Sequence, residues 1–276
     1  MLLLVLRSLP DRQRCLSRSN ERSKPNSLAP AQIDMGKRCR IIVYGDSLAL
    51  SREWDGVARE ETYPELLCSA LRSAREEGAV LENRSHAGEP IERKFERYAK
   101  EGLRGDVLIL QCGIVDCAPR PISPSLRAAI GKIPGLLRWP IVRLLHVARP
   151  WLLRLGLVWR NTSIERFEAV LSTWLARALN EGMMVCVVNI APTNSAAERQ
   201  SPGLSASISA YNACIERAVS LQPGSRLVDV HAAILKQGAD ANPYVNQRDG
   251  HHITRAGHRL YADLILEAAL PAEQRA

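Results

Sequence analysis

Short apolar runs that alternate with amphipathic segments are the feature that most restricts the fold of this chain. Five apolar runs follow one another between residues 39 and 234: CRIIVYG, AVLENRSHAG, DVLILQCG, MMVCVVNIAP and RLVDVHAAI. Segments with helical spacing of apolar residues separate these runs or follow the last one, at 62–78, 89–102, 164–182, 205–221 and 254–270. Strands that alternate with helices predict a parallel sheet with helices on both faces. The continuous apolarity of the third run indicates a strand buried on both sides.

The first apolar run ends abruptly at Gly45-Asp46-Ser47, a small and polar triplet. In open parallel sheets, ligands bind beyond the carboxyl ends of the strands, which is where this triplet lies. Two interpretations follow. The triplet is either a plain exit from the strand, or it holds Ser47 at the edge of the sheet for chemistry.

A second polar segment, NQRDGHHITRAGH at 246–258, stands directly before the last helical segment. Asp249 and His252 are three residues apart. This spacing lets the carboxylate fold back onto the imidazole and fix its tautomer and orientation, which is the task of the third member of a catalytic triad. The spacing favours His252 over His251, which we expect to be a loop or surface residue. We expect His258 to pack or cap on the last helix.

Together, these two segments resemble the blocks that mark the SGNH or GDSL family of esterases and lipases. YGDSLAL matches the first block, with Ser47 in the nucleophile position, and DGHH matches the last block, Asp-x-x-His. The segment NRSHAG stands where the family has a glycine that donates a backbone N–H, which puts Gly88 in that role. The resemblance therefore implies a triad of Ser47, His252 and Asp249, and an oxyanion hole made by the N–H groups of Ser47 and Gly88.

The resemblance covers about residues 38–270, with an interruption at 120–160. It implies a flavodoxin-like α/β fold, a three-layer α/β/α sandwich around a five-stranded parallel sheet. It also implies hydrolysis of an ester or similar acyl bond, in a lipid or an acylated carbohydrate, without a metal ion or cofactor. We expect a single domain of this type over residues 38–272.

One block departs from the family pattern. Where the family has Gly-x-Asn-Asp after the third strand, this chain has Gly113-Ile114-Val115-Asp116, and a valine side chain cannot donate a hydrogen bond to an oxyanion. Loss of one such donor typically lowers kcat by about 10²–10³-fold. Three hypotheses therefore stay open: a serine hydrolase, an acyltransferase with the same site, and a catalytically weak or inactive protein that binds an acylated or glycan ligand.

Three further residues are candidates for substrate binding near this site. Asp116 closes the departing block, and Arg120 follows it four residues later. Arg120 either supplies positive charge at the rim of the site or is simply a solvated arginine. His86 lies in the loop of the second strand, where it either lines the site or faces solvent.

The positive charge of the chain is concentrated in two segments. The formal net charge is +8, yet residues 117–164 alone contain eight basic residues and no Asp or Glu, and residues 1–40 contain nine basic and three acidic residues. The rest of the chain is therefore net acidic. This distribution argues against a nucleic-acid-binding domain, in which basic residues would cover the folded surface.

The basic segment at 120–160 is longer than a usual strand-to-helix connection, so we expect it to form helices of its own. Two prolines, Pro140 and Pro150, are expected to divide it into short helices. It also contains three tryptophans among leucine, isoleucine and valine: Trp139, Trp151 and Trp159. Such a segment is typical of a helical cap on the domain, of contact with an anionic membrane surface through residues 126–160, or of an anionic polymer as partner.

Three other expectations concern location, cysteines and the amino-terminal segment. No apolar run reaches about 18 residues, so no spanning helix is expected, and the expected location is cytoplasmic, with peripheral membrane contact as an option. The seven cysteines include no Cys-x-x-Cys pair, which favours buried free thiols over disulfides or a metal site. Residues 1–37 are rich in Arg and Ser after a very short apolar run. A disordered or basic tail, a transit peptide and translation from Met35 stay open for this segment.

Overall fold

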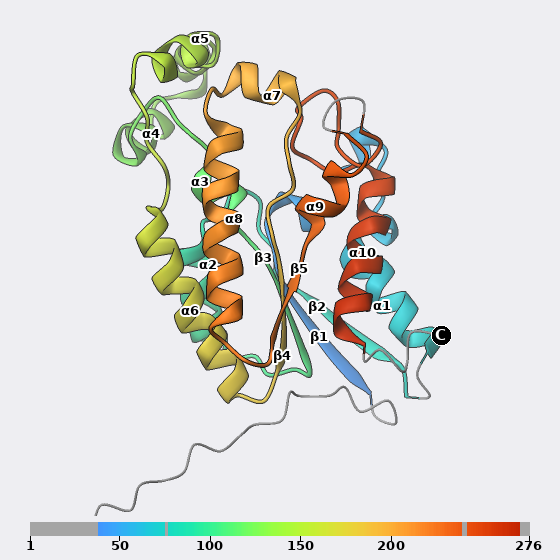
Figure 1. Cartoon of the computed structure of the whole chain (residues 1–276). Coiled ribbons are helices and arrows are strands. Elements are labelled where there is room, and N and C mark those ends of the chain that lie inside the picture. Colours follow the sequence, from blue (N-terminus) through green and yellow to red (C-terminus); the bar gives the residue numbers. More distant parts are fainter. Residues whose placement is uncertain (1–37, 75–76, 239–241, 271–276) are drawn as a thin grey trace, which may run out of the picture.

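The computed structural model describes residues 38–74, 77–238 and 242–270, so the predicted tail at 1–37 lies outside the described residues. Its centre is a parallel sheet of five strands in the order β2-β1-β3-β4-β5 (Figure 1). The strands are β1 (Cys39–Tyr44), β2 (Ala79–Asn83), β3 (Val107–Gln111), β4 (Met184–Val188) and β5 (Ser225–Val228). Each of the five apolar runs contributes one strand, which confirms the predicted sheet.

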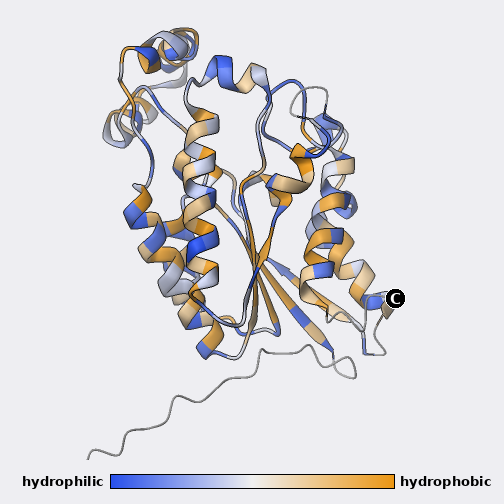
Figure 2. Cartoon of the chain, in the orientation of Figure 1, coloured by the Kyte–Doolittle hydropathy of each residue, from blue (hydrophilic) through white to orange (hydrophobic). Residues whose placement is uncertain are grey.

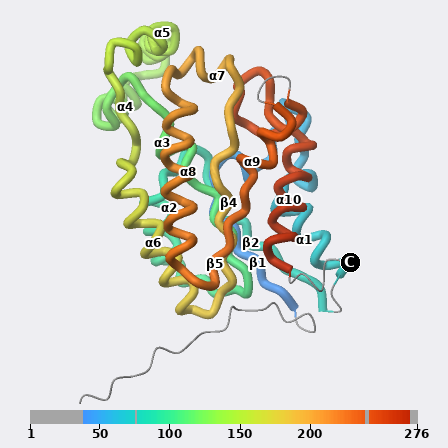
Figure 3. Tube along the Cα trace, viewed as in Figure 1, coloured from blue at the N-terminus to red at the C-terminus, as the bar shows by residue number. Residues whose placement is uncertain are grey.

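Helices cover both faces of the sheet and complete the three layers, as the cartoon and the tube along the chain show (Figures 1 and 3). One face is covered by α1 (Tyr63–Ala74) and α10 (Arg255–Ala269). The other face is covered by α2 (Ile91–Glu101), α6 (Ile164–Asn180) and α8 (Leu204–Ser220). These are the five helical segments that the apolar spacing predicts, so the three-layer α/β/α architecture is confirmed.

β1 illustrates how the sequence builds a core on each face of the sheet. Successive side chains of a strand point to opposite faces. Ile41 and Val43 belong to the core beneath α1 and α10, whereas Ile42 and Tyr44 belong to the core beneath the other three helices. All residues of β3 are buried, as its continuous apolarity predicts. In Figure 2 the strands accordingly appear mostly apolar, whereas the helices around them mix apolar and polar residues.

Short elements gather at the carboxyl end of the sheet. The 3-10 helices η1 (Ser47–Ala49), η2 (Glu53–Asp55) and η3 (Arg59–Glu61) follow β1, and α3 (Ile114–Cys117) follows β3. α7 (Ser195–Gln200) and α9 (Val230–Leu235) follow β4 and β5. The strand ends are nearly level, because Tyr44 pairs with Leu110 and Gln111 pairs with Val188. The loops after the strands therefore meet at one edge of the sheet.

The basic segment forms α4 (Pro124–Gly131) and α5 (Gly135–Arg154), and the prediction that its prolines divide the second helix was wrong. α5 runs without interruption through Pro140 and Pro150. A proline lacks the N–H that would bond the carbonyl four residues earlier. For Pro150 that carbonyl is the one of His146, which accepts instead from Nε2 of Gln200 in α7 at 2.9 Å. For Pro140 it is the carbonyl of Leu136, whose side chain is 93% exposed, so this turn faces solvent.

Six cysteines lie in the described residues, and all six are buried, as predicted: Cys39, Cys68, Cys112, Cys117, Cys186 and Cys214. The five that follow Cys39 are free thiols, also as predicted. Cys15 lies outside the described residues. None of the helices that the structure describes combines the length and the apolar character needed to cross a bilayer.

Candidate active site

The turn after β1 is fixed by hydrogen bonds to the ends of two neighbouring strands. The N–H of Gly45 donates to Oγ of Ser85 at 2.9 Å, and the N–H of Asp46 donates to Oε1 of Gln111 at 3.0 Å. The fully buried Asp46 carboxylate accepts from Nε2 of Gln111 and from the N–H of Leu48, both at 3.0 Å. Ser47 lies between Asp46 and Leu48 in the chain, so these hydrogen bonds fix its position relative to the sheet.

Gly45 is required because the chain has no room for a side chain there. A Cβ at this position would lie 2.7 Å from Cβ of Ala49 and 2.8 Å from Oγ of Ser85. This close approach lets Ser47 emerge, half-buried, as the first residue of η1 at the carboxyl end of β1. The triplet therefore holds Ser47 at the edge of the sheet, where a ligand would bind.

The loop before α10 folds the Asp249 carboxylate back onto His252. Oδ1 of Asp249 accepts from the N–H groups of His251 and His252 at 3.1 and 3.0 Å, and Oδ2 lies 2.8 Å from Nδ1 of His252. Gly250 has a φ of 71°, and a Cβ there would overlap the Asn194 side chain, so only glycine fits this turn. An ionised carboxylate only accepts hydrogen bonds, so Nδ1 carries the imidazole proton.

The two loops meet across the top of the sheet. Oγ of Ser47 lies 2.9 Å from Nε2 of His252, although 205 residues separate them in the sequence. Because Nδ1 of His252 is protonated toward Asp249, Nε2 is the acceptor of the Ser47 hydroxyl. Hydroxyl, imidazole and carboxylate thus form one continuous hydrogen-bonded chain.

The charges around this chain keep Asp249 ionised. Burial raises the pKa of the Asp249 carboxyl, but the hydrogen bonds from the His252 ring and from two backbone N–H groups outweigh it and hold the pKa well below its usual range. Nη2 of Arg52 lies 3.3 Å from Oδ2 and adds a positive charge. The ring of His251 lies 4.0 Å from the ring of His252, and burial together with that neighbour lowers the pKa of His251. His252 therefore stands between an anion and an uncharged imidazole.

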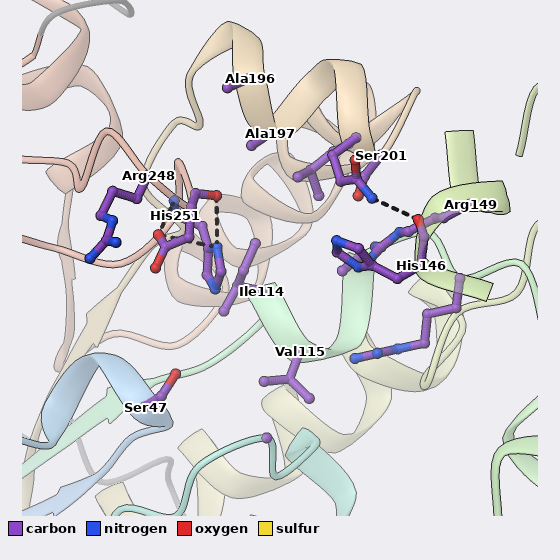
Figure 4. A pocket seen from close by; sticks show the side chains of 16 residues that line it. Ser47, Ile114, Val115, His146, Arg149, Ala196, Ala197, Ser201, Arg248 and His251 are labelled. Atoms are coloured by element: carbon purple, nitrogen blue, oxygen red, sulfur yellow. Dashed lines mark hydrogen bonds and ion pairs between the residues drawn. The ribbon is translucent and has the colours of Figure 1, made fainter. Parts of the chain in front are cut away.

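A pocket of about 550 Å³ opens beside Ser47 (Figure 4). The loops after the first three strands contribute Ser47, Gly88 and Val115 to its wall. Its far side comes from α5, with His146 and Arg149. The remaining wall is formed by Ile114, Ala118, Arg120, Ala196, Ala197, Gln200, Ser201, Leu204, Arg248, Asp249 and His251.

The sequence predicts that two residues of the pocket wall, Ser47 and Gly88, donate their backbone N–H groups to an oxyanion. Gly88 lines the pocket with a φ of 70°, and Ser47 begins η1. Within the part of the chain that the structure describes, no protein atom accepts a hydrogen bond from the N–H of either residue. Val115 lies in the same wall, 8% exposed, and presents only methyl groups.

The other predicted binding residues divide into one that reaches the pocket and two that do not. Arg120 lines the pocket. Asp116 is fully buried, and its Oδ1 accepts from the N–H of Ile91 at 3.0 Å and from the hydroxyl of Thr162 at 2.6 Å, so it fastens α2 and the start of α6 to α3. His86 lies on an exposed loop and is absent from the pocket wall. The structure therefore corrects the expectation that Asp116 contacts substrate, and His86 takes the solvent-facing one of its two predicted alternatives.

A model of the GDSL-like lipase/acylhydrolase family matches residues 43–260, well over half of the chain. The chain belongs to this family. No curated protein matches the sequence closely enough to count as a relative.

Several solved structures have the same fold. A lipase/acylhydrolase from Enterococcus faecalis matches with a TM-score of 0.57 at 15% identity, over 83% of this chain and 94% of that one. An acetyl xylan esterase from Geobacillus stearothermophilus matches with a TM-score of 0.56 at 16% identity, over 85% and 96% of the two chains. A protein named TesA matches with a TM-score of 0.53 at 15% identity, over 83% and 97%. At such identities the likeness establishes the fold alone.

Several residues in the pocket of this GDSL-family chain were missed by sequence reasoning. His251 is a loop residue, as expected, but it also lines the pocket beside His252. His146 and Arg149 come from α5. The regular recurrence of arginines in this segment was a signal for a basic helix, but it did not indicate which arginine faces the site.

One cluster has the composition of a metal site. In the described part of this GDSL-family chain, ligand atoms of Asp249, His251 and His252 lie within 4.8 Å of one another. Two of these residues, Asp249 and His252, already contact each other through Oδ2 and Nδ1 at 2.8 Å. A metal ion on these atoms would therefore replace the hydrogen-bonded chain to Ser47 rather than supplement it.

Proposed function

We propose that this GDSL-family protein is a serine hydrolase that cleaves an acyl ester. Ser47 is the nucleophile, His252 the general base, and Asp249 the residue that orients His252. Membership of the family and the presence of esterases among the structural neighbours support an ester hydrolase in general. The observation that carries the mechanism is the hydrogen-bonded chain from Oγ of Ser47 through His252 to Asp249, with contacts of 2.9 and 2.8 Å.

In the first half of the reaction, Nε2 of His252 takes the hydroxyl proton while Oγ of Ser47 attacks the carbonyl carbon. The carbonyl oxygen becomes an oxyanion and accepts hydrogen bonds from the N–H groups of Ser47 and Gly88. The intermediate then collapses, and the leaving alcohol takes the proton from His252. The acyl group remains on Ser47 as an ester.

In the second half, water attacks the acyl-enzyme after His252 removes its proton, and the acid leaves as Ser47 recovers its hydrogen. Asp249 stays ionised throughout, because its pKa is held low, and stabilises each imidazolium that forms on His252. No step requires a metal ion or cofactor.

The acyl bond belongs, in this proposal, to a lipid or to an acylated carbohydrate. The apolar part of the pocket wall, made by Ile114, Val115, Ala118 and Leu204, supports a site for the acyl group. The acetyl xylan esterase among the structural neighbours motivates an acetylated carbohydrate as one arm of a substrate screen.

Val115 is the observation that favours a second candidate function. With methyl groups in place of a third oxyanion donor, the site would stabilise the transition state less, and the protein would bind an acylated or glycan ligand with little turnover. Acyl transfer to a sugar hydroxyl is the further alternative, because an alcohol can replace water in the second half of the reaction.

Labelling with a fluorophosphonate probe tests the proposed function. An activated Ser47 reacts covalently, so we expect wild-type protein to be labelled and Ser47→Ala to remain unlabelled. Ser209→Ala, which removes an exposed hydroxyl on α8, is the matched control and should label like wild type. Hydrolysis of p-nitrophenyl acetate and butyrate should follow the same pattern. Turnover that survives in Ser47→Ala would contradict the mechanism, and labelling without turnover would favour the binding protein.

We also propose that the outer face of α5 lies against an anionic membrane surface. The residues of this helix that are exposed include Leu136, Trp139, Leu144 and Trp151. Its basic residues have no acidic neighbour in the sequence between 117 and 164. Apolar and aromatic side chains combined with exclusively positive charge are typical of a helix that lies in a lipid interface.

Sedimentation with vesicles tests this contact. We expect the protein to bind vesicles that contain phosphatidylglycerol and to bind pure phosphatidylcholine vesicles much less, because the charge term acts only on anionic lipid. Trp151→Ala should weaken binding. Trp54→Ala, which removes another exposed tryptophan far from α5 in the sequence, is the matched control and should not. Equal binding by both variants would exclude α5 as the contact surface.

A further inference from the structure

Two arginines in the pocket wall lack a carboxylate within ion-pair distance, and the buried Asp116, which acts on Arg120 from further away, offsets its loss of hydration only in part. Arg120 follows α3 and Arg149 belongs to α5, and both line the pocket that contains Ser47. Among the described residues, neither forms an ion pair. Arginines on other elements are paired, for example Arg97 with Glu89 and Arg217 with Glu168.

These two arginines are also partly withdrawn from water. Burial, together with repulsion from Arg127 and Arg149, lowers the pKa of Arg120 to about 10, and burial lowers the pKa of Arg149. Nε of each guanidinium is buried without a hydrogen-bond acceptor in the described part of the chain, although Nη2 of Arg149 donates to the carbonyl of Pro119 at 2.8 Å. A cation removed from water is costly unless an anion accompanies it.

The charged groups that face the same pocket do not offset this cost. Asp249 is the sole carboxylate among the residues that line the pocket, and its oxygens are occupied by His252, by two backbone N–H groups and by Arg52. Arg248 adds a third, exposed positive charge to the wall. The pocket therefore has an uncompensated positive charge beside its nucleophile.

We propose that Arg120 and Arg149 bind a phosphate group of the substrate, so that the site selects esters that carry a phosphate over neutral esters. This inference rests on the proposed function, because it names the substrate class of the same site. Guanidinium groups present planar forks of N–H donors that match phosphate oxygens. Two unpaired guanidiniums also match the charge of a phosphate monoester, which is about −1.5 to −2 near neutral pH.

The phosphate can belong to a phospholipid headgroup or to a small soluble ester, and substrate pairs distinguish these sources. The short-chain pair is butyryl glycerol phosphate against monobutyrin, and the long-chain pair is oleoyl lysophosphatidate against monoolein. Release of the acid is followed by titration at constant pH. We expect kcat/KM to be about 10- to 100-fold higher for the phosphate member, as charge-assisted hydrogen bonds imply. A preference in both pairs indicates the phosphate itself, and one confined to the long-chain pair indicates a lipid headgroup.

Variants of the two arginines assign this preference to the subsite. Arg120→Gln and Arg149→Gln should each reduce the ratio of the two kcat/KM values about tenfold. Arg154→Gln is the matched control, because Arg154 is exposed on the same helix, lies over the Trp151 ring and does not line the pocket. It should keep the wild-type ratio. If a pocket variant does not fold, the ratio of the wild-type protein still decides.

Failure of the subsite and failure of the proposed hydrolase give different results. If Ser47 is labelled and neutral esters are hydrolysed as fast as their phosphate partners, the phosphate subsite is overturned and the hydrolase stands. If no ester is turned over, calorimetry with Ser47→Ala decides: butyryl glycerol phosphate should bind at least tenfold more tightly than monobutyrin. Equal binding of the two would overturn the inference.

Discussion

Val115 offers the sharpest test of the site, because one substitution should add what the pocket lacks. We consider Val115→Asn, which places a carboxamide N–H₂ donor in the wall beside Ser47 and Gly88. The backbone there is well fixed: the carbonyl of Val115 accepts from Nδ2 of Asn161 at 2.7 Å, and the next residue, Asp116, is tied to two neighbouring elements. The new side chain therefore starts from a defined position.

The expected magnitude follows from the number of donors. The site has two backbone N–H groups that lack a protein acceptor, and a third donor is worth about 10²–10³ in kcat in enzymes built around it, or roughly 3–4 kcal/mol. Because this pocket has not been shaped for the carboxamide, we expect about a 10- to 100-fold rise in kcat. Val115 is only 8% exposed, so the polar replacement should lower the free energy of unfolding by about 1–2 kcal/mol.

The assay is the steady-state hydrolysis of p-nitrophenyl butyrate, combined with thermal unfolding to establish that each variant is folded. Val115→Asp is the matched control, because it has the same shape as the asparagine but places a negative charge where the oxyanion forms. It should lower kcat below that of wild type. The reasoning is refuted if Val115→Asn folds and reacts with the fluorophosphonate probe but has an unchanged kcat, since Val115 would then not face the oxyanion.

Three other outcomes are expected. Asp249→Asn should lower kcat by roughly 10³–10⁴-fold while the melting temperature reports an intact fold, since His252 loses the acceptor that fixes its tautomer; a small loss would mean that Asp249 does not orient the base. Incubation with EDTA should leave the rate unchanged, because Asp249, His251 and His252 act here without a metal ion, and recovery of a lost rate by added zinc would contradict this. Burial lowers the pKa of His258 to about 4 from the usual 6.5, so the unfolded chain takes up this proton before the folded one does. The stability from neutral His258 is complete above about pH 6.5 and declines as the pH falls toward 4, by about 3 kcal/mol. In His258→Gln, which can still accept from the N–H of Tyr63, urea unfolding should lose that part of its pH dependence, and an identical pH dependence would refute the assignment.

The sheet and its main helices were predictable because local pattern and tertiary role agree in them. In β1, side chains alternate between two cores: Ile41 and Val43 lie in one, and Ile42 and Tyr44 in the other. This alternation requires only that the strand be buried on both faces, which its apolar composition predicts. The continuity of α5 was not predictable. It depends on the side chain of Gln200, which donates a hydrogen bond to the His146 carbonyl. Gln200 is 54 residues from His146, so the sequence around Pro150 does not indicate that this carbonyl has a partner.

In the candidate site too, residues fixed by local sequence were predictable and residues placed by tertiary contacts were not. Ser47, His252 and Asp249 were found because their spacing and sequence blocks carry the chemistry, and hydrogen bonds within each loop fix their local geometry. The role of Asp116 was predicted wrongly, because the sequence does not show whether a carboxylate near a site faces the pocket or binds the helices beneath it. Arg149 stayed hidden for a different reason: only the docking of α5 against α7 decides which side of this basic helix becomes pocket wall.

The two sides of α5 make the two proposals about this helix separable. Residues three and four apart in a helix share a face, so His146 and Arg149, which line the pocket, form one stripe with the buried Leu153. The exposed residues Leu144, Val147 and Trp151 form another, and Trp151 is two positions from Arg149, which places it about 200° around the helix axis. A substitution on one stripe should therefore leave the other intact. Trp151→Ala should lose vesicle binding but keep the preference for phosphate esters, and Arg149→Gln should do the reverse. If both substitutions impaired both properties, membrane contact and phosphate recognition would be one surface, and the orientation of α5 against the pocket would have to be reconsidered.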